Sequence, residues 1–444
     1  MRLDCFVCFV CLQGFFVPHS STNTNPTDHT IAKKLQQNWL LPDGVADVLF
    51  TDAQKQESLR DALLFVLTAH GYRLVSPPLI EYTESLLGHA DEDLKRQTFK
   101  FIDQLNGRLM GLRADITPQI LRIDSKYGQG ISRYCYVGQV VKTLPTGLFG
   151  LRTPLQMGAE IFGVDSIDAE ISLIDLLAAL MDEIGLARDR LHMDVGHVAI
   201  FERLCALHQV SATDVDALMA IYHKKALPEL QAFCQTLGDA LGDADGANDF
   251  LVLGKHTLVQ DGVPNAANLL SKLSAKARND VSIVKATDEI VALIAHIRTL
   301  GMGVSLDVTE LSGYHYHTGI VFNAYLAHSQ TAQTQALVRG GRFKGLSIDG
   351  KMRAATGFSM DINRLLEFVE LEEDTVIWVD YTDLQGATAE QKADLSEQIK
   401  TLQTEGCIVI KPLSADDKPQ TVDGVLHFDR KQGVWAVQLV GDEF

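Results

Sequence analysis

Apolar positions recur at the spacing of amphipathic helices in three parts of the chain. One pattern covers residues 51–70 and stops at Gly71, and a second covers residues 165–185. Residues 198–300 are helical in pattern almost throughout. The spacing therefore predicts two single helices and one inserted group of helices.

Runs of strand-forming residues lie on both sides of the inserted helices. In TFKFIDQLNGRLMGLRAD, Asn106-Gly107 separates two such runs and predicts a hairpin with a two-residue turn. The runs are joined by turns, without a regular alternation of strands and helices. This order favours an α+β fold, an antiparallel sheet flanked by helices, over a doubly wound parallel sheet.

The same pattern divides the chain into three parts. Residues 1–37 are mostly polar after a short apolar stretch, which indicates a flexible N-terminal extension. Residues 38–370 carry the strands of the core, with the helical insertion at about 198–300. Residues 371–444 combine short apolar strands with a polar helix, which predicts a small C-terminal α/β domain.

Charge and cysteine content narrow the possible functions. The chain has 444 residues, a net charge of −18 and no run rich in lysine or arginine, so we do not expect it to bind nucleic acid. Its longest apolar stretch is too short to cross a membrane. Seven irregularly spaced cysteines are typical of a reducing compartment, which favours the cytoplasm. Cys5, Cys8 and Cys11 resemble part of an iron–sulfur motif, but a fourth ligand is missing.

Three acceptor side chains form the clearest candidate site. Gln156 and Glu160 are an even number of residues apart on one predicted strand, so they share a face. Together with Asp115 they could surround the ammonium group of a small zwitterion. The alternative is an ordinary solvated sheet face.

Two further motifs are less specific. His315 and His317 alternate along a predicted strand and could bind zinc, but no third ligand is identifiable, so we expect no metal. Gly340-Gly341 follows a strand and would let a ligand approach the backbone, although a tight turn explains it equally well. Phosphate loops of the Walker type and a GxGxxG motif are absent from the sequence.

In chain order these segments resemble the catalytic core of histidyl-tRNA synthetase, a class II aminoacyl-tRNA synthetase, over roughly residues 38–370. The resemblance is carried by the Asn-Gly hairpin and by GLRADITPQILR, the stretch 134–163, YHYHTGIVF, RGGRF and TGFSMDINRLL. It implies a six- or seven-stranded antiparallel sheet that holds histidine and ATP. The histidine-binding residues that it implies are Asp115, Thr117, Gln156, Glu160, Tyr316 and His317, with His317 departing from a family tyrosine.

The resemblance fails at the residues that bind ATP in the family. A family arginine that clamps the α-phosphate falls at Lys142, a family glutamate at Leu144, and a family glycine at Asp361, whereas Arg364 is kept. Two other family arginines fall at Gly150 and near Ser312. Each lost transition-state donor costs on the order of 3–4 kcal/mol, so we expect no adenylate formation and no catalytic residues.

A histidine pocket without activation chemistry resembles the regulatory subunits of ATP phosphoribosyltransferase. This resemblance implies a noncatalytic subunit, without a cofactor, that activates a short catalytic subunit allosterically in the first step of histidine biosynthesis. It also implies L-histidine as feedback effector, self-association as dimers and a hetero-octamer of four chains of each kind. The alternatives are an active histidyl-tRNA synthetase and a paralogue with another amino-acid task.

Overall fold

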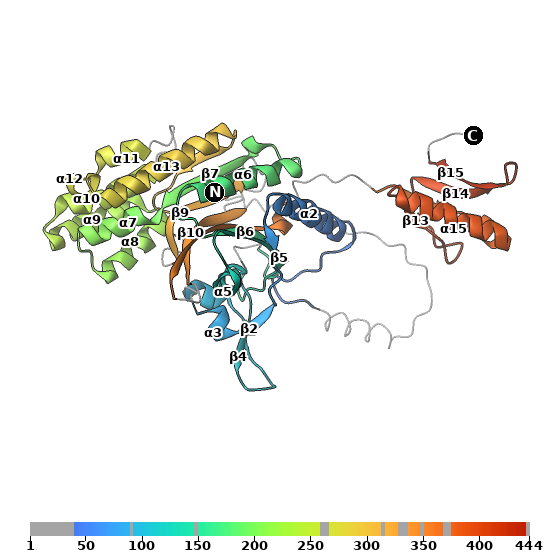
Figure 1. Cartoon of the computed structure of the whole chain (residues 1–444), viewed down its shortest axis with the longest axis horizontal. Helices are drawn as coiled ribbons and strands as arrows, with labels where there is room; N and C mark the ends of the chain where they lie inside the picture. The colour runs from blue at the N-terminus through green and yellow to red at the C-terminus, as the bar shows by residue number, and fades with distance from the viewer. Residues whose placement is uncertain are drawn as a thin grey trace, which may run out of the picture. The chain divides into compact units, whose positions relative to one another are not determined.

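The computed structural model describes residues 40–88, 92–145, 150–257, 266–311, 316–326, 336–346, 350–366 and 374–440. The chain divides into two compact units, 1–364 and 365–444 (Figure 1). The predicted extension 1–37 with Cys5, Cys8 and Cys11 lies outside the described residues, as do Ser312 and His315.

A large sheet forms the centre of the first unit. Its eight strands lie in the order β1-β5-β6-β11-β10-β9-β7-β8. In that order they are β1 (Arg73–Leu74), β5 (Ser132–Gln139), β6 (Leu155–Phe162), β11 (Met352–Asp361), β10 (Val338–Leu346), β9 (His317–Leu326), β7 (Leu191–His197) and β8 (Gly303–Leu306).

The sheet is antiparallel in its interior and parallel at both edges. Strand β1 pairs with β5 in parallel and β7 pairs with β8 in parallel, whereas the five pairs between β5 and β7 are antiparallel. The α+β fold is therefore confirmed, but the expectation of six or seven strands, all antiparallel, is wrong at the edges. Parallel neighbours require long crossover connections, and both edge pairs have them.

Helices cover both faces of this sheet (Figure 1). On one face, helix α6 packs against β11, and helix α13 contacts β7, β8 and β9. On the other face, helix α5 contacts β10. Between β7 and β8 the chain forms α7 (Val198–Leu207), α8 (Ala212–Lys224), α9 (Leu227–Leu241), α10 (Ala244–Thr257), α11 (Ala266–Lys272), α12 (Ala275–Arg278) and α13 (Val281–Thr299). The other helices of the unit are α2 (Phe50–Ala69), α3 (Thr83–Leu86), α4 (Glu92–Gln97), α5 (Thr117–Tyr127), α6 (Asp168–Glu183), η1 (Arg188–Arg190) and η2 (Ile362–Arg364).

The sequence explains why α5 begins where it does and which face of α6 is buried. Pro118 occupies the first turn of α5, where its missing N–H costs no helical hydrogen bond. In α6 the buried residues Leu173, Ile174, Leu177 and Met181 recur at helical spacing and face the sheet and its neighbouring helices. Both helices are thus fixed over the strands that carry the candidate residues.

A small sheet projects from the unit and contains the predicted hairpin. It consists of β2 (Ile80–Tyr82), β4 (Leu109–Leu112) and β3 (Lys100–Ile102) in that order. The hairpin turn is longer than the two residues predicted, because the Asp103 N–H donates to the Arg108 carbonyl at 2.8 Å. Gly107 adopts a φ of 75° within the turn, which explains the glycine.

The second unit is a four-stranded sheet with two helices. Its elements are β12 (Val376–Val379), α14 (Tyr381–Gly386), α15 (Ala389–Thr404), β13 (Ile408–Ile410), β14 (Gly424–Asp429) and β15 (Val434–Leu439). The strands lie in the order β13-β12-β14-β15 around a core that includes Leu395, Leu426 and Trp435. Across both units, no helix of the described residues is both long and apolar enough to span a membrane.

Candidate functional site

A pocket of about 240 Å³ lies over the face of the central sheet that carries α5. Five of the six residues predicted for ligand binding line it. They are Asp115, Thr117, Glu160, Tyr316 and His317. These residues come from three separate segments of the chain, and the fold brings them together.

Strand register explains the floor of the pocket. Glu160 on β6 pairs with Gly357 on β11, which pairs with Gly341 on β10, which pairs with Val321 on β9. Cross-strand partners share a face, so two glycines leave the sheet bare beside Glu160. A Cβ at Gly341 would lie 2.9 Å from His317 Nδ1, and one at Gly357 would lie 2.6 Å from Glu160 Cγ.

Gln156 does not line the pocket but holds a residue that does. Its amide nitrogen donates to Asp115 Oδ1 at 2.7 Å, and its amide oxygen accepts from the Ile116 N–H at 3.0 Å. The Thr117 N–H also approaches Asp115 Oδ1, at 3.4 Å. Asp115 is therefore fixed at the start of α5 with one carboxylate oxygen committed to these contacts, and the predicted role of Gln156 becomes positioning.

Glu160 is the most unusual group in the pocket. Its side chain is 1% exposed, and neither carboxylate oxygen has a hydrogen-bond partner among the described residues. Burial raises the pKa of Glu160 well above its ordinary value and the nearby Asp115 adds to the rise, while the hydroxyl groups of Thr117 and Tyr136 oppose it. An unpartnered buried carboxyl group is costly, so the site favours a ligand that donates a hydrogen bond to it.

Aromatic rings form a wall of the pocket. Tyr316 stacks on Phe343, with ring centroids 4.9 Å apart, and meets the His317 ring edge-on at 5.3 Å. The Tyr316 hydroxyl is buried without a hydrogen-bond partner in the part of the chain that is described. His317 Nδ1 lies 3.3 Å from the Arg342 carbonyl oxygen, an acceptor that fixes the proton on Nδ1.

Other residues of the pocket were not predicted from the sequence. Arg339 on β10 lies between Asn323 on β9 and Ser359 on β11, and all three line the pocket. Glu310 also lines it. The strand-like run ALVRGGRF placed Arg339 on the same face as Gly341, so alternation along that strand is the signal that could have found it.

The residues that the resemblance aligned with the synthetases' nucleotide-binding residues lie outside the lining of this pocket. Burial lowers the pKa of Lys142, and its backbone N–H donates to the Arg152 carbonyl at 2.8 Å. Leu144 is exposed. Burial raises the pKa of Asp361 to about 6. Arg364 Nη1 donates to the Ala336 carbonyl at 2.6 Å, so this retained arginine has a structural partner.

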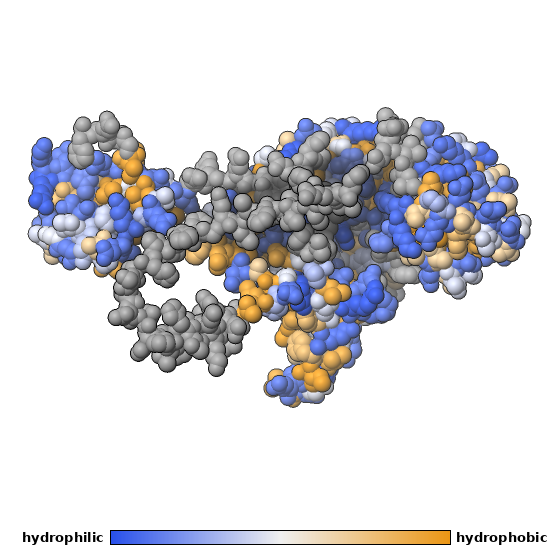
Figure 2. All heavy atoms as spheres, turned by 180° about the vertical axis from the view of Figure 1, so that it is seen from behind, coloured by the Kyte–Doolittle hydropathy of each residue, from blue (hydrophilic) through white to orange (hydrophobic). Residues whose placement is uncertain are grey.

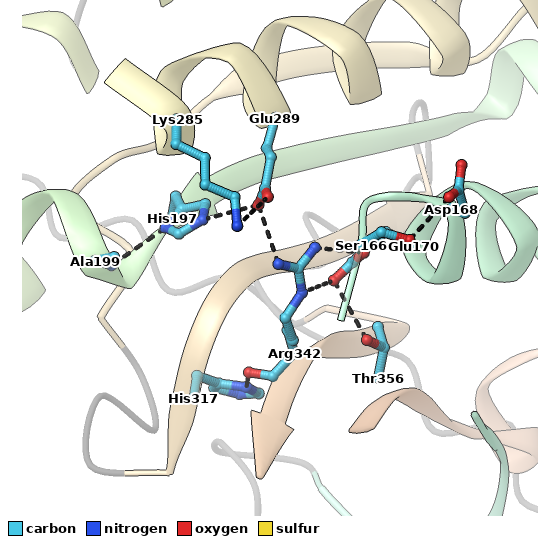
Figure 3. Close-up of polar contacts among 10 residues, drawn as sticks. All are labelled: Ser166, Asp168, Glu170, His197, Ala199, Lys285, Glu289, His317, Arg342 and Thr356. Carbon is cyan, nitrogen blue, oxygen red and sulfur yellow. Dashed lines mark hydrogen bonds and ion pairs between the residues drawn. The ribbon is translucent and has the colours of Figure 1, made fainter. Parts of the chain in front are cut away.

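A buried ionic network lies on the opposite face of β10 (Figure 3). Arg342 donates to both carboxylate oxygens of Glu170 on α6, at 2.7 and 2.8 Å, and to Glu289 on α13 at 3.1 Å. Glu289 also contacts His197 at 3.3 Å and Lys285 at 3.7 Å. The strand that floors the pocket is thereby tied to two helices.

Comparisons with known proteins agree with this architecture. Residues 44–365 match the family described as histidyl-tRNA synthetase. The chain is 52% identical to an ATP phosphoribosyltransferase regulatory subunit of Psychrobacter arcticus over 386 residues, which are 86% of this chain and 95% of that protein. It is 36% identical to the protein of that name from Acinetobacter baumannii over 415 residues, 91% of this chain and 100% of the other.

Solved structures share the fold. An ATP phosphoribosyltransferase regulatory subunit/histidyl-tRNA synthetase from Bacillus halodurans superimposes with a TM-score of 0.67 and 21% identity, covering 84% of this chain and 92% of that one. A histidyl-tRNA synthetase from Nostoc has a TM-score of 0.65 and 15% identity, covering 90% and 97%. The class II synthetase-like fold with its central sheet flanked by helices is therefore confirmed.

Proposed function

Because the chain belongs to the family of ATP phosphoribosyltransferase regulatory subunits, we propose that it regulates that enzyme as a noncatalytic, histidine-responsive subunit. The reaction is the first step of histidine biosynthesis, in which ATP and phosphoribosyl pyrophosphate give phosphoribosyl-ATP and pyrophosphate. A separate short catalytic subunit carries it out, in the cytoplasm. The chain itself is not expected to be a catalytic synthetase.

The observation that carries the effector role is the set of unpartnered polar groups facing the pocket. The Glu160 carboxyl group and the Tyr316 hydroxyl are both buried without partners among the described residues. A neutral imidazole presents one N–H donor and one nitrogen acceptor, which these two groups match. Asp115, held by Gln156, then remains for the ammonium group of histidine. We therefore propose the same six residues as the histidine site, with Gln156 acting through Asp115.

The loss of activation chemistry supports regulation rather than synthesis. Adenylate formation requires donors that neutralise charge on the reacting phosphate, and each is worth on the order of 3–4 kcal/mol. Lys142 offers one partly buried ammonium group instead of a bidentate fork. Asp361 replaces a glycine of the synthetase family, and a carboxyl group at that position would oppose the binding of polyphosphate.

We also propose self-association as dimers and assembly with the short catalytic subunit, four chains of each. The small sheet supports an interface, because several of its apolar side chains are exposed: Leu79, Ile80, Ile102, Leu105 and Leu109. Leu105 is 95% exposed and Ile102 is 66% exposed. Figure 2 shows apolar residues on the projecting lobe that this sheet forms. Large exposed apolar patches mark interaction surfaces.

Reconstitution tests the proposal. The purified chain is mixed with the short catalytic subunit, and formation of phosphoribosyl-ATP is followed while histidine is added; native mass spectrometry gives the stoichiometry. We expect activity only in the mixture and inhibition by histidine. An inactive mixture, or the formation of histidyl-adenylate by this chain alone, contradicts the proposed role.

A matched pair of variants assigns the effector site. Glu160→Gln removes the pocket carboxylate, whereas Glu183→Gln removes an exposed one at the end of α6. We expect the first variant to bind histidine about 5- to 100-fold more weakly in calorimetry and the second to bind normally, because a buried group left without its hydrogen-bond partner costs about 1–3 kcal/mol. Equal affinities in the two variants would remove Glu160 from the site.

A further inference from the structure

A row of polar side chains crosses the floor of the pocket next to the bare glycine row. Arg339 on β10 pairs with Ser359 on β11 and with Asn323 on β9. Cross-strand partners share a face, and all three side chains line the pocket. A guanidinium, an amide and a hydroxyl therefore stand side by side, and each can donate hydrogen bonds to an anionic group.

Arg339 is available for such a contact. Within the described part of the chain its side chain makes no hydrogen bond or ion pair, and it is exposed to solvent. Arg342, three positions along the same strand, is fully engaged by Glu170 and Glu289 on the opposite face. The described residues that line the pocket include the carboxyl groups of Asp115, Glu160 and Glu310, and the guanidinium of Arg339 is permanently charged.

The strand register sets the distance between Arg339 and Glu160. Glu160 and Arg339 are two strands apart and one two-residue step apart along the strands. Two strand spacings correspond to about 10 Å, and two residues along a strand to about 7 Å, between Cα atoms. Gly341 and Gly357 occupy the floor beside Glu160, so an amino acid can lie between a carboxyl group at one end and a guanidinium at the other.

Resting on the proposed effector role of this pocket, we propose that Arg339 receives the effector's carboxylate and makes the site select an amino acid over the corresponding amine. Arginine suits this task because its planar fork donates two hydrogen bonds to one carboxylate. Asn323 and Ser359 flank the fork and can each add a donor. The carboxyl groups of Asp115 and Glu160 offer no donor that matches two carboxylate oxygens, so the ligand carboxylate is directed toward Arg339.

Calorimetry on the full-length chain tests this assignment with two ligands and three proteins. The ligands are L-histidine and histamine, which lacks the carboxylate. The proteins are the wild type, Arg339→Gln and the control Lys344→Gln, which removes an exposed cation from the same strand but not from the pocket. Unfolding midpoints of the three proteins verify that they are equally folded.

We expect Arg339→Gln to weaken histidine binding by about 10- to 100-fold, the range for a charge-assisted hydrogen bond, and to leave histamine binding within twofold. Lys344→Gln should bind both ligands as the wild type does. If the wild type binds histidine and Arg339→Gln binds it equally well, the carboxylate assignment is wrong while the effector site stands. If the wild type binds no histidine, both proposals are wrong.

Discussion

Neutralising Glu289 should destabilise the first unit in a way that depends on pH. Burial by itself raises the pKa of Glu289, but the hydrogen bond with His197 and the charges of Arg342 and Lys285 overcome that effect and lower it from 4.5 to about 2. A lowering of this size corresponds to about 3 kcal/mol of stability at neutral pH. We therefore expect Glu289→Gln to lose up to about 3 kcal/mol at pH 7.

The sign of the pH dependence follows from the direction of the shift. A carboxyl group whose folded pKa is depressed stabilises the fold above its unfolded pKa, and that contribution is lost as the pH falls. For Glu289 the window runs from about pH 4.5 down to about pH 2. The wild type should lose stability over this window, and the difference from Glu289→Gln should shrink with it.

Urea unfolding followed by far-UV circular dichroism at several pH values measures the effect. Hydrogen–deuterium exchange in peptides from α13 and β10 assigns it to the first unit. Lys285→Gln is the matched control, because Lys285 contacts the same carboxylate at 3.7 Å but is 67% exposed, and exposed pairs contribute at most about 1 kcal/mol. Equal losses in the two variants at pH 7, or an unchanged acid slope in Glu289→Gln, would refute the reasoning.

Two further predictions concern the sheet floor. Burial raises the pKa of Asp361 from 3.8 to about 6, so its charged form destabilises the fold as the pH rises through that range; Asp361→Asn should add about 1–3 kcal/mol at pH 8 and nothing near pH 3.5, as measured by denaturant midpoints. A Cβ at Gly357 would lie 2.6 Å from Glu160 Cγ and 3.0 Å from the Ala159 carbonyl. Gly357→Ala should therefore weaken histidine binding at least tenfold in calorimetry, whereas Gly386→Ala, where a Cβ meets no atom within 4 Å, should leave it unchanged.

Local periodicity was enough to identify the elements of the core and the shared face of Gln156 and Glu160. It could not show that Gln156 turns its amide to Asp115, because that contact joins residues 41 positions apart. The parallel edge pairs were missed for a similar reason, since strand direction depends on where a crossover returns the chain. The length of the hairpin turn depended on the bond between Asp103 and Arg108, which the Asn-Gly signal does not encode.

The ionic network was also missed, although the sequence carried a signal for it. Glu170 lies three positions before Leu173 and four before Ile174, on the apolar face of α6, so helical spacing alone could have indicated a buried charge there. Its partner Arg342 is 172 positions away, beyond the reach of any local pattern. A charged residue on an apolar face therefore indicates a distant partner without identifying it.

The alternation along β10 divides two tasks between neighbouring residues. Arg339 and Gly341 face the pocket, whereas Arg342 faces α6 and α13 and is held there by three hydrogen bonds to Glu170 and Glu289. Removing one partner of a buried charge pair costs about 3–5 kcal/mol, so the strand resists displacement toward the pocket. The backbone carbonyl that anchors His317 belongs to this same Arg342. A strand held this firmly favours a pocket that is formed before the ligand binds. Binding then costs little conformational entropy for ordering the site, so differences in contacts decide which ligand binds more tightly.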